Sequence, residues 1–292
     1  MVREKRSYDI TEVRKQIYWD LPSDIGTIRG LLEDYSGIEP EEVNAHILAI
    51  REKLWRIKPY GCIGRFRFLN LDFTADPGYQ QAIGQLRKTF SNTTFLDLGC
   101  CVGQVLRQLA HDGAWTGRLY GTDLEPRFMD VGYELFNDRK RLRSTFVAGD
   151  IFSDGETQAE DPMRLLDGRI TIVHATSFFH LFGWDDQVRA ARRVVRLLKP
   201  RDQNAFIFGR QVGCDEPSAL PEGGPGGRQD KFLHNAESWQ RMWDVVGEET
   251  GTQWRTEWDV IPDPPDSAAN VSDESNSEME GMRRIRFGVY RA

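Results

Sequence analysis

The stretch Phe95–Gly103, FLDLGCCVG, decides the fold of this 292-residue chain. Its first four residues are mainly apolar and predict a short buried strand, and the small residues after them predict a tight turn before a helix. A glycine turn lets the backbone approach a nucleoside closely, and the amino end of the following helix supplies positive potential. The stretch therefore predicts a nucleoside-binding unit of strand, turn and helix.

The glycine spacing in this turn excludes two common nucleotide-binding loops. From Gly99 the sequence reads Gly-x-Cys-x-x-Gln, which lacks the second and third glycines of the GxGxxG dinucleotide fingerprint. No Lys-Ser or Lys-Thr pair follows Gly103, so the loop is not a P-loop. It resembles instead the D-x-G-x-G-x-G loop of class I S-adenosylmethionine (SAM) methyltransferases, with Cys101 at the middle glycine. A loop that only packs a strand against a helix is the alternative.

Two later acidic motifs follow in the order found in that family. Asp123 ends the run LYGTD, and an acid at the end of a second strand can accept both hydrogen bonds of a ribose diol, although capping of the next helix is an alternative. The stretch FVAGDIF at 146–152 resembles the third-strand motif, in which Asp150 meets the adenine amino group and Ile151 packs on the ring. The resemblance implies these cofactor contacts: Asp97, Gly99, Cys101, Gly103, Asp123, Leu124, Gly149, Asp150, Ile151 and His174.

From about residue 93 onward, short apolar runs alternate with amphipathic segments, a pattern typical of βαβ units and a parallel sheet. The predicted strands are 94–98, 118–122, 144–148, 170–175, 205–208, 253–261 and 283–291, with helices near 103–111, 125–138, 185–198 and 235–250. The predicted fold class is α/β, with a doubly wound, mostly parallel, Rossmann-like sheet of seven strands that ends in an antiparallel hairpin. Residues 91–292 are expected to form the SAM-binding domain.

Residues 1–90 are expected to form an N-terminal helical cap that covers the substrate. Between Pro40 and Lys58, apolar residues recur at spacings of three and four, which predicts a helix with one buried face. Pro40 is expected in its first turn, where proline is tolerated. A second helix, capped by Ser23 or Asp24, is expected to end near Gly37.

Composition bounds the partners of the protein. The formal net charge is −7, but the segment 262–280 contains six acidic residues and no basic ones, so the rest of the chain is close to −1. This acidic insert is expected to be disordered, so the acidity says little about the site. The acidic balance of the whole chain, without a basic excess, argues against nonspecific nucleic-acid binding. No apolar run is long enough for a membrane span, and the four cysteines lack zinc-site or CxxC spacing. We expect a soluble, cytoplasmic protein without a metal.

The segment after the fourth predicted strand is where reacting groups belong in this fold. It reads HATSFFHLF at 174–182 and lacks the Asp/Asn-Pro-Pro-aromatic motif of many amine methyltransferases, which counts against DNA and protein amide substrates. His180 is the candidate general base, and a packing or substrate-orienting role is the alternative. His174 is expected to contact the cofactor, or to be a buried histidine with satisfied hydrogen bonds.

The resemblance extends over nearly the whole chain. The stretches YSGI at 35–38 and PYGCIGRFRFL at 59–69, together with FFHLF at 178–182, GRQVG at 209–213 and His234-Asn235, resemble fungal secondary-metabolite methyltransferases, notably those of meroterpenoid pathways. That likeness implies oxygen methylation of polyketide-terpenoid intermediates, often at a carboxylate to give a methyl ester. A carboxylate needs no general base, whereas a phenol would need one.

The substrate is expected to be large and apolar, because many aromatic residues surround the predicted site. We expect Trp55, Tyr60 and Phe178 to line the pocket, and Arg210 or Arg65 to hold a substrate anion, with a strand-end surface position as the alternative. The Gly- and Pro-rich segment 214–229 is a candidate lid.

The leading hypothesis is a SAM-dependent O-methyltransferase of a small secondary metabolite. Two alternatives keep the cofactor but change the role: a catalytically silent SAM-binding regulator, and a cyclase in which the sulfonium acts electrostatically. A homodimer formed through the cap is also possible.

Overall fold

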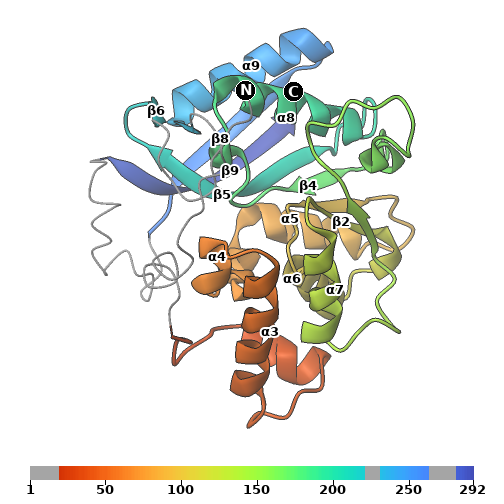
Figure 1. The fold of residues 1–292 in the computed structure, drawn as a ribbon. Helices are drawn as coiled ribbons and strands as arrows, with labels where there is room; N and C mark the ends of the chain where they lie inside the picture. The colour runs from red at the N-terminus through yellow and green to blue at the C-terminus, as the bar shows by residue number, and fades with distance from the viewer. Residues whose placement is uncertain (1–19, 221–230, 263–280) are drawn as a thin grey trace, which may run out of the picture.

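The computed structural model describes residues 20–220, 231–262 and 281–292. A seven-stranded sheet forms its middle layer, with the strand order β3-β2-β1-β4-β5-β9-β8 (Figure 1). The first five strands are parallel to one another, and β9 is antiparallel to both β5 and β8. The bounds are β1 (Phe95–Leu98), β2 (Leu119–Asp123), β3 (Thr145–Ala148), β4 (Ile172–His174), β5 (Phe206–Cys214), β8 (Trp254–Val260) and β9 (Met282–Arg291). The predicted fold class is confirmed.

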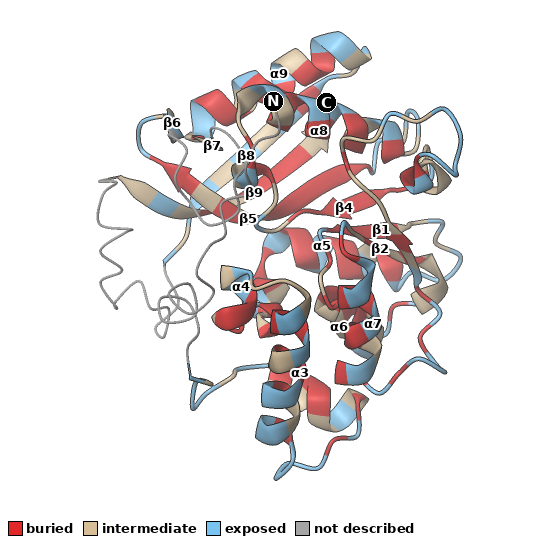
Figure 2. Cartoon of the chain, in the orientation of Figure 1, coloured by how far each residue is buried: buried red, intermediate tan, exposed pale blue. Residues whose placement is uncertain are grey.

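Helices cover both faces of this sheet (Figure 1). One layer holds α5 (Pro77–Leu86), α6 (Gln104–His111) and α7 (Pro126–Leu135), and the other holds α8 (Trp184–Leu197) and α9 (Ala236–Thr250). The buried residues gather on the strands and on the inward faces of these helices (Figure 2). Each face of the sheet has its own apolar core, as a sheet buried on both faces requires.

The strand order places a topological switch point beside β1. The chain runs from β1 outward to β2 and β3, then returns to add β4 on the other side of β1. Asp97 pairs in register with Gly121 of β2 and with His174 of β4. Ligands of doubly wound sheets bind at the carboxyl ends of the strands at such a point, so the fold positions a site around Asp97.

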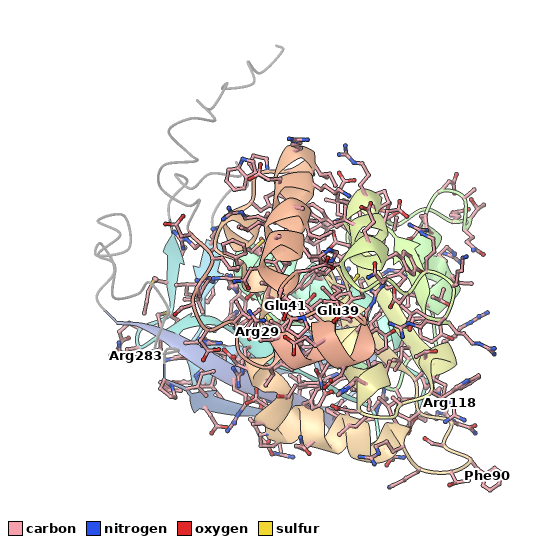
Figure 3. The ribbon with its side chains drawn as sticks, turned by 90° about the horizontal axis from the view of Figure 1, so that it is seen from below. Arg29, Glu39, Glu41, Phe90, Arg118 and Arg283 are labelled. Atoms are coloured by element: carbon pink, nitrogen blue, oxygen red, sulfur yellow. The ribbon has the colours of Figure 1, made fainter. Side chains whose placement is uncertain are left out.

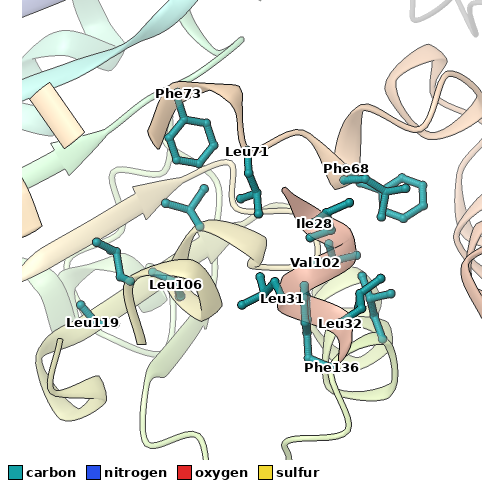
Figure 4. Close-up of a cluster of buried hydrophobic side chains, with 14 of the residues drawn as sticks. Ile28, Leu31, Leu32, Phe68, Leu71, Phe73, Val102, Leu106, Leu119 and Phe136 are labelled. Carbon is teal, nitrogen blue, oxygen red and sulfur yellow. The ribbon is translucent and has the colours of Figure 1, made fainter. Parts of the chain in front are cut away.

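The N-terminal region packs beside α6 and α7. It contains α2 (Ile28–Gly30), the π-helix η1 (Leu31–Tyr35), α3 (Val43–Ile57), α4 (Gly61–Gly64) and the short 3-10 helices η2 (Arg67–Leu69) and η3 (Asp72–Ala75). Apolar side chains from this region and from α6 form one cluster, in which Ile28, Leu31 and Leu32 lie close to Val102 and Leu106 (Figure 4). Charged side chains such as Arg29, Glu39 and Glu41 lie on the outer face (Figure 3).

A hydrogen bond from Tyr35 to a buried ion pair fastens this region to the sheet domain. Arg107 of α6 donates to both carboxylate oxygens of Asp138 at 2.9 and 3.1 Å, and both side chains are fully buried. The Tyr35 hydroxyl donates to the same carboxylate at 2.9 Å. Because burial and the neighbouring Asp138 both disfavour a phenolate, the pKa of Tyr35 is raised above its usual range. The N-terminal region is therefore locked to α6 by buried polar contacts as well as by apolar packing.

Several predicted boundaries were wrong. The predicted helix at Pro40 begins at Val43, because residues 40–42 form a turn. The fifth strand runs on to Cys214 because it pairs with β9 over its whole length. The flanks of the predicted lid form an additional hairpin, β6 (Ser218–Leu220) with β7 (Lys231–Leu233).

Further predictions concern the candidate lid, the acidic insert, membrane spans and metal sites. Residues 221–230 of the predicted lid and 263–280 of the acidic insert lie outside the described residues. In the part of the chain that the structure describes, no helix has the length and apolarity to cross a membrane. Over the same residues, no group of three or more His, Cys, Asp or Glu side chains could hold a metal ion.

Candidate cofactor and substrate site

The loop between β1 and α6 has a backbone that favours glycine at three alternating positions. The φ angles are +74° at Gly99, +49° at Cys101 and +66° at Gly103, all in the left-handed region. A side chain at Gly103 would also collide with Arg107, whose guanidinium would lie 2.5 Å from the added Cβ. Cys101 thus adopts the conformation of the glycine it replaces in the D-x-G-x-G-x-G pattern, at the cost of some strain.

Asp123 at the end of β2 organises this loop. Its Oδ2 accepts from the Cys101 amide at 2.9 Å, and its Oδ1 accepts from the Glu125 amide at 3.0 Å. Burial raises the pKa of Asp123, while these two amides oppose the shift. Each carboxylate oxygen keeps a second lone pair, so the side chain can still accept two hydrogen bonds from a diol.

Asp97 and His174 face each other across the β1–β4 pair. His174 Nδ1 lies 2.7 Å from Asp97 Oδ1, and Thr176 Oγ1 lies 2.7 Å from His174 Nε2. Within the described residues, the other carboxylate oxygen, Asp97 Oδ2, is buried and has no hydrogen-bond partner. A buried carboxylate oxygen without a donor is costly, so this atom calls for a cationic or N–H donor from a ligand.

The third-strand motif also lies at this edge of the sheet. Asp150 is half-buried, and its Oδ1 accepts from the Phe152 amide at 3.0 Å, which fixes the turn after β3. Ile151 is buried in the core on the α8 and α9 side. Gly149 lets Met163 pack closely, because a Cβ atom at position 149 would lie only 2.6 Å from the Met163 side chain. Leu124 is about half exposed, which suits an apolar residue that packs on a ligand.

The segment after β4 brings Phe178 against the cofactor loop. Phe178 packs over Gly99, so that a Cβ atom added to this glycine would lie 3.4 Å from a carbon of the Phe178 ring. Ser177, just before it, has φ +54°, a strained conformation for a non-glycine residue. His180 follows in the short 3-10 helix η6 (Phe179–Leu181), and burial lowers its pKa to about 3, helped by the charges of Lys231 and Arg67. His180 is therefore neutral at physiological pH.

The predicted substrate residues lie in different surroundings. Tyr60 is 41% exposed and its ring meets Phe128 edge-on at 6.0 Å. Trp55 is buried in the core of the N-terminal region. Arg210 donates from Nε and from a terminal nitrogen to Asp76, both at 2.6 Å. Its guanidinium is therefore already paired with a carboxylate of the protein, and not with a substrate anion as predicted.

Residues that sequence reasoning missed include Thr176 and Asp76. Thr176 carried a weak signal, since it follows His174 by two residues at the carboxyl end of β4. Asp76 carried no functional signal, because its partner Arg210 lies 134 residues further along the chain. Cys62 of α4 was not predicted in the site either, yet it lies near Cys101, whose pKa is raised by burial and by the nearby Cys62 and Asp123.

These residues fit an S-adenosyl ligand. The glycine-like loop gives close backbone approach, Asp123 keeps acceptors for a ribose diol, and the unpartnered oxygen of Asp97 can accept from an ammonium group. Asp150 is half-buried and Leu124 about half exposed, so both side chains are open to a ligand. When bound, SAM supplies a sulfonium-activated methyl group; the protein has to hold the acceptor in line and exclude water.

Family models match both parts of the chain. A model described as "Meroterpenoid methyltransferase N-terminal domain" matches residues 11–69, and one described as "Methyltransferase domain" matches residues 95–201. With the fold and the cofactor loop, these matches define a class I SAM-dependent methyltransferase.

Curated relatives identify the family more closely. The chain is 41% identical to "O-methyltransferase phiE" of a fungal species over 92% of this chain and 89% of the relative. It is 40% identical to "O-methyltransferase atr3" of Stereocaulon alpinum over 94% of this chain and 75% of the relative. It is 37% identical to "Asnovolin E/Chermesin D methyltransferase nvfJ" of Aspergillus novofumigatus over 78% and 79%. The chain belongs to this family of fungal secondary-metabolite methyltransferases.

Proposed function

We propose that this methyltransferase transfers the methyl group of SAM to a carboxylate oxygen of a polyketide-terpenoid intermediate and so forms a methyl ester. The observation that carries the proposal is the state of His180, whose pKa of about 3 makes it a weak base. Proton abstraction is efficient only when the pKa of the base lies near the working pH. A phenol or alcohol acceptor would receive little help from this side chain, whereas a carboxylate is already ionised.

The electrostatics around His180 support an anionic acceptor. Lys231 on β7 and Arg67 on η2 are the two charges that act on the His180 ring, and both are positive. The β7 hairpin is held against the segment after η6 by a hydrogen bond from the Phe232 amide to the Phe182 carbonyl at 2.9 Å. Positive charge beside a neutral, half-buried ring favours a substrate carboxylate over a neutral hydroxyl.

The apolar residues support a large acceptor. Tyr60, Leu124 and Leu181 are among the most exposed large apolar side chains of the described residues, and Phe178 is half-buried against the cofactor loop. Exposed apolar groups of this kind gather at binding sites for apolar ligands. We therefore place the substrate between the 58–70 segment and η6, and we keep Trp55 as a residue that shapes this region from the core.

The test uses SAM with an isotope-labelled methyl group and a panel of prenylated aromatic acids, each paired with its amide. We expect label in the acids only, and we expect alkaline hydrolysis to release it as methanol, because esters are saponified and aryl ethers are not. Label that survives alkali would overturn the carboxylate and favour a phenol. Unlabelled product of unchanged mass would favour cyclisation, and no product despite SAM binding would favour a regulator.

Two finer predictions accompany this proposal. We retain the homodimer, which size-exclusion chromatography with light scattering checks directly. We also retain the absence of a metal requirement, since methyl transfer from a sulfonium to a carboxylate needs no Lewis acid. Activity that survives treatment with a chelator is the expected result.

A further inference from the structure

A line of side-chain and backbone contacts runs from Asp97 in β1 to Asp76 at the start of α5. His174 contacts Asp97 Oδ1 and Thr176 Oγ1, each at 2.7 Å. The Arg210 amide donates to the same Thr176 oxygen at 3.1 Å, and the Arg210 side chain ends on Asp76. The line therefore joins the cofactor strand to the N-terminal region.

One assignment of hydrogen-bond donors and acceptors is consistent with every contact along this line. The Arg210 amide can only donate, so Thr176 Oγ1 accepts from it and keeps its own proton for His174 Nε2. His174 must then carry its proton on Nδ1, where it is donated to Asp97 Oδ1. One tautomer satisfies both ring nitrogens of His174 and the hydroxyl of Thr176, and the second oxygen of the Asp97 carboxylate, Oδ2, has no partner within the described residues.

Aromatic rings keep the imidazole of His174 in this orientation. Its centroid lies 5.1 Å from that of Phe73, 5.1 Å from that of Phe208 and 6.3 Å from that of Phe95, which stacks on it. Phe73 belongs to η3, the 3-10 helix that leads into Asp76. The N-terminal region is therefore linked to His174 in two ways. Phe73 contacts the imidazole ring directly, and Asp76 is connected to it through Arg210 and Thr176.

We propose that His174 and Thr176 are positioning residues that hold Asp97 for the methionine ammonium of SAM, and that Asp76 and Arg210 make this hold depend on docking of η3. The inference rests on the cofactor and not on the carboxylate acceptor. Asp97 Oδ2 is a buried anionic acceptor that lacks a donor, and an ammonium is the complementary group. Since coupling between sites is reciprocal, SAM binding also stabilises the docked N-terminal region.

The first experiment separates the two ends of the cofactor. Binding of S-adenosylhomocysteine and of 5′-methylthioadenosine, which lacks the amino-acid part, is measured by calorimetry for the wild type, Thr176→Val and Thr176→Ser. We expect Thr176→Val to weaken S-adenosylhomocysteine by about tenfold and to leave methylthioadenosine unchanged, because the lost hydrogen bond supports the charged contact. Thr176→Ser should bind like the wild type. An equal loss for both ligands, or no loss, would overturn the proposal.

The second experiment tests the link to the N-terminal region. Asp76→Asn removes the charge that holds Arg210 and that Arg286 also contacts, at 3.4 Å. Asp130→Asn is the matched control, because Asp130 is exposed and pairs with the exposed Arg139. We expect a loss of roughly threefold or more in S-adenosylhomocysteine affinity for Asp76→Asn, with methylthioadenosine unchanged and Asp130→Asn at wild-type values. Wild-type affinity in a folded Asp76→Asn protein would refute the link to η3 and leave the Thr176 result to decide the rest.

Discussion

The two halves of the site are built in different ways. The cofactor half comprises the carboxyl ends of β1, β2 and β3 with the loop 99–103, and its side chains are fixed by nearby backbone groups, as Asp123 is by the Cys101 and Glu125 amides. The proposed substrate half comprises the segment 58–70, η6 and the β6–β7 hairpin. Its groups come from distant parts of the chain, as when Lys231 and Arg67 both act on His180.

This difference explains how one fold serves many acceptors. The chemistry of the cofactor never changes, so a short loop and a few carboxylates suffice to bind it, and these can be carried by local sequence. The acceptor varies, and the segments that meet it are loops and short helices that lie outside the sheet. The substrate half can therefore change without any change in the core that positions the methyl donor.

The largest expected effect concerns the buried ion pair of the sheet domain to which Tyr35 of the N-terminal region is hydrogen-bonded. Replacing Arg107 by Met leaves Asp138 buried without its cation, so we expect the free energy of unfolding to fall by about 3–5 kcal/mol. Arg139→Met is the control, because the Arg139–Asp130 pair is exposed and worth about 1 kcal/mol or less. Urea unfolding measures both variants, and similar losses for the two would contradict the role given to the buried pair.

The next effect is confined to the cofactor half. Asp123→Ala removes the acceptors for a ribose diol, and we expect roughly 100-fold weaker binding of S-adenosylhomocysteine, from two charge-assisted hydrogen bonds. The exposed Asp130 of α7 provides the control variant Asp130→Ala. Calorimetric titration gives the affinities. Wild-type affinity in Asp123→Ala would show that the second strand does not hold the ribose.

The third prediction concerns the pH dependence of stability that His180 of the substrate half contributes. His180 has a folded pKa of about 3, below the unfolded value near 6.5, so protons bind the unfolded chain more readily between these values. Stability should therefore fall as the pH drops below about 6.5, with up to about 2 kcal/mol lost through His180 by pH 5. Thermal melts of His180→Asn should show a smaller loss over this window.

A second histidine provides a comparison for this effect. His234, whose pKa burial lowers to about 3, should add a loss of the same sign. A wild-type slope in His180→Asn would mean that the ring is not the buried neutral group described above.

The smallest effect compares two glycines of the helices below the sheet. A Cβ atom added to Gly84 in α5 would have no neighbouring atom within 4 Å. Gly84→Ala should therefore stabilise the protein by about 0.5–1 kcal/mol. Gly132 in α7 lies under the cofactor loop, where a Cβ would come within 2.3 Å of the Val102 carbonyl oxygen. Gly132→Ala should be destabilising, and a gain in melting temperature there would contradict the tight packing of α7 on the loop.

The sequence predicted the fold and the loop of the cofactor half because their signals are local. The left-handed positions of the loop required glycine at 99 and 103, and Asp123 stood at the end of an apolar run. The doubly wound sheet with a final antiparallel hairpin followed from the alternation of strands and helices. The predictions failed at boundaries, as at Pro40 and at the end of β5, where pairing with a distant strand decides the length, and they missed the β6–β7 hairpin.

The substrate half was less predictable because its contacts are long-range. Arg210 matched an anion-binding residue by type, but Asp76 reaches it from 134 positions away, and no pattern along the chain marks that pairing. The same holds for Tyr35 with Asp138. The neutral state of His180 is likewise set by packing, so residue type alone suggested a stronger base than the folded protein contains.

The most direct test of this account is the pH dependence of kcat/KM for methyl transfer to a prenylated aromatic acid, at saturating SAM, in the wild type and in His180→Asn. The account predicts a rate that does not depend on pH from about 6 to 9 in both proteins, because an ionised carboxylate needs no base. A wild-type rate that climbs steadily with pH, or a slope that His180→Asn abolishes, would show that a hydroxyl is deprotonated at this site and would contradict the carboxylate mechanism.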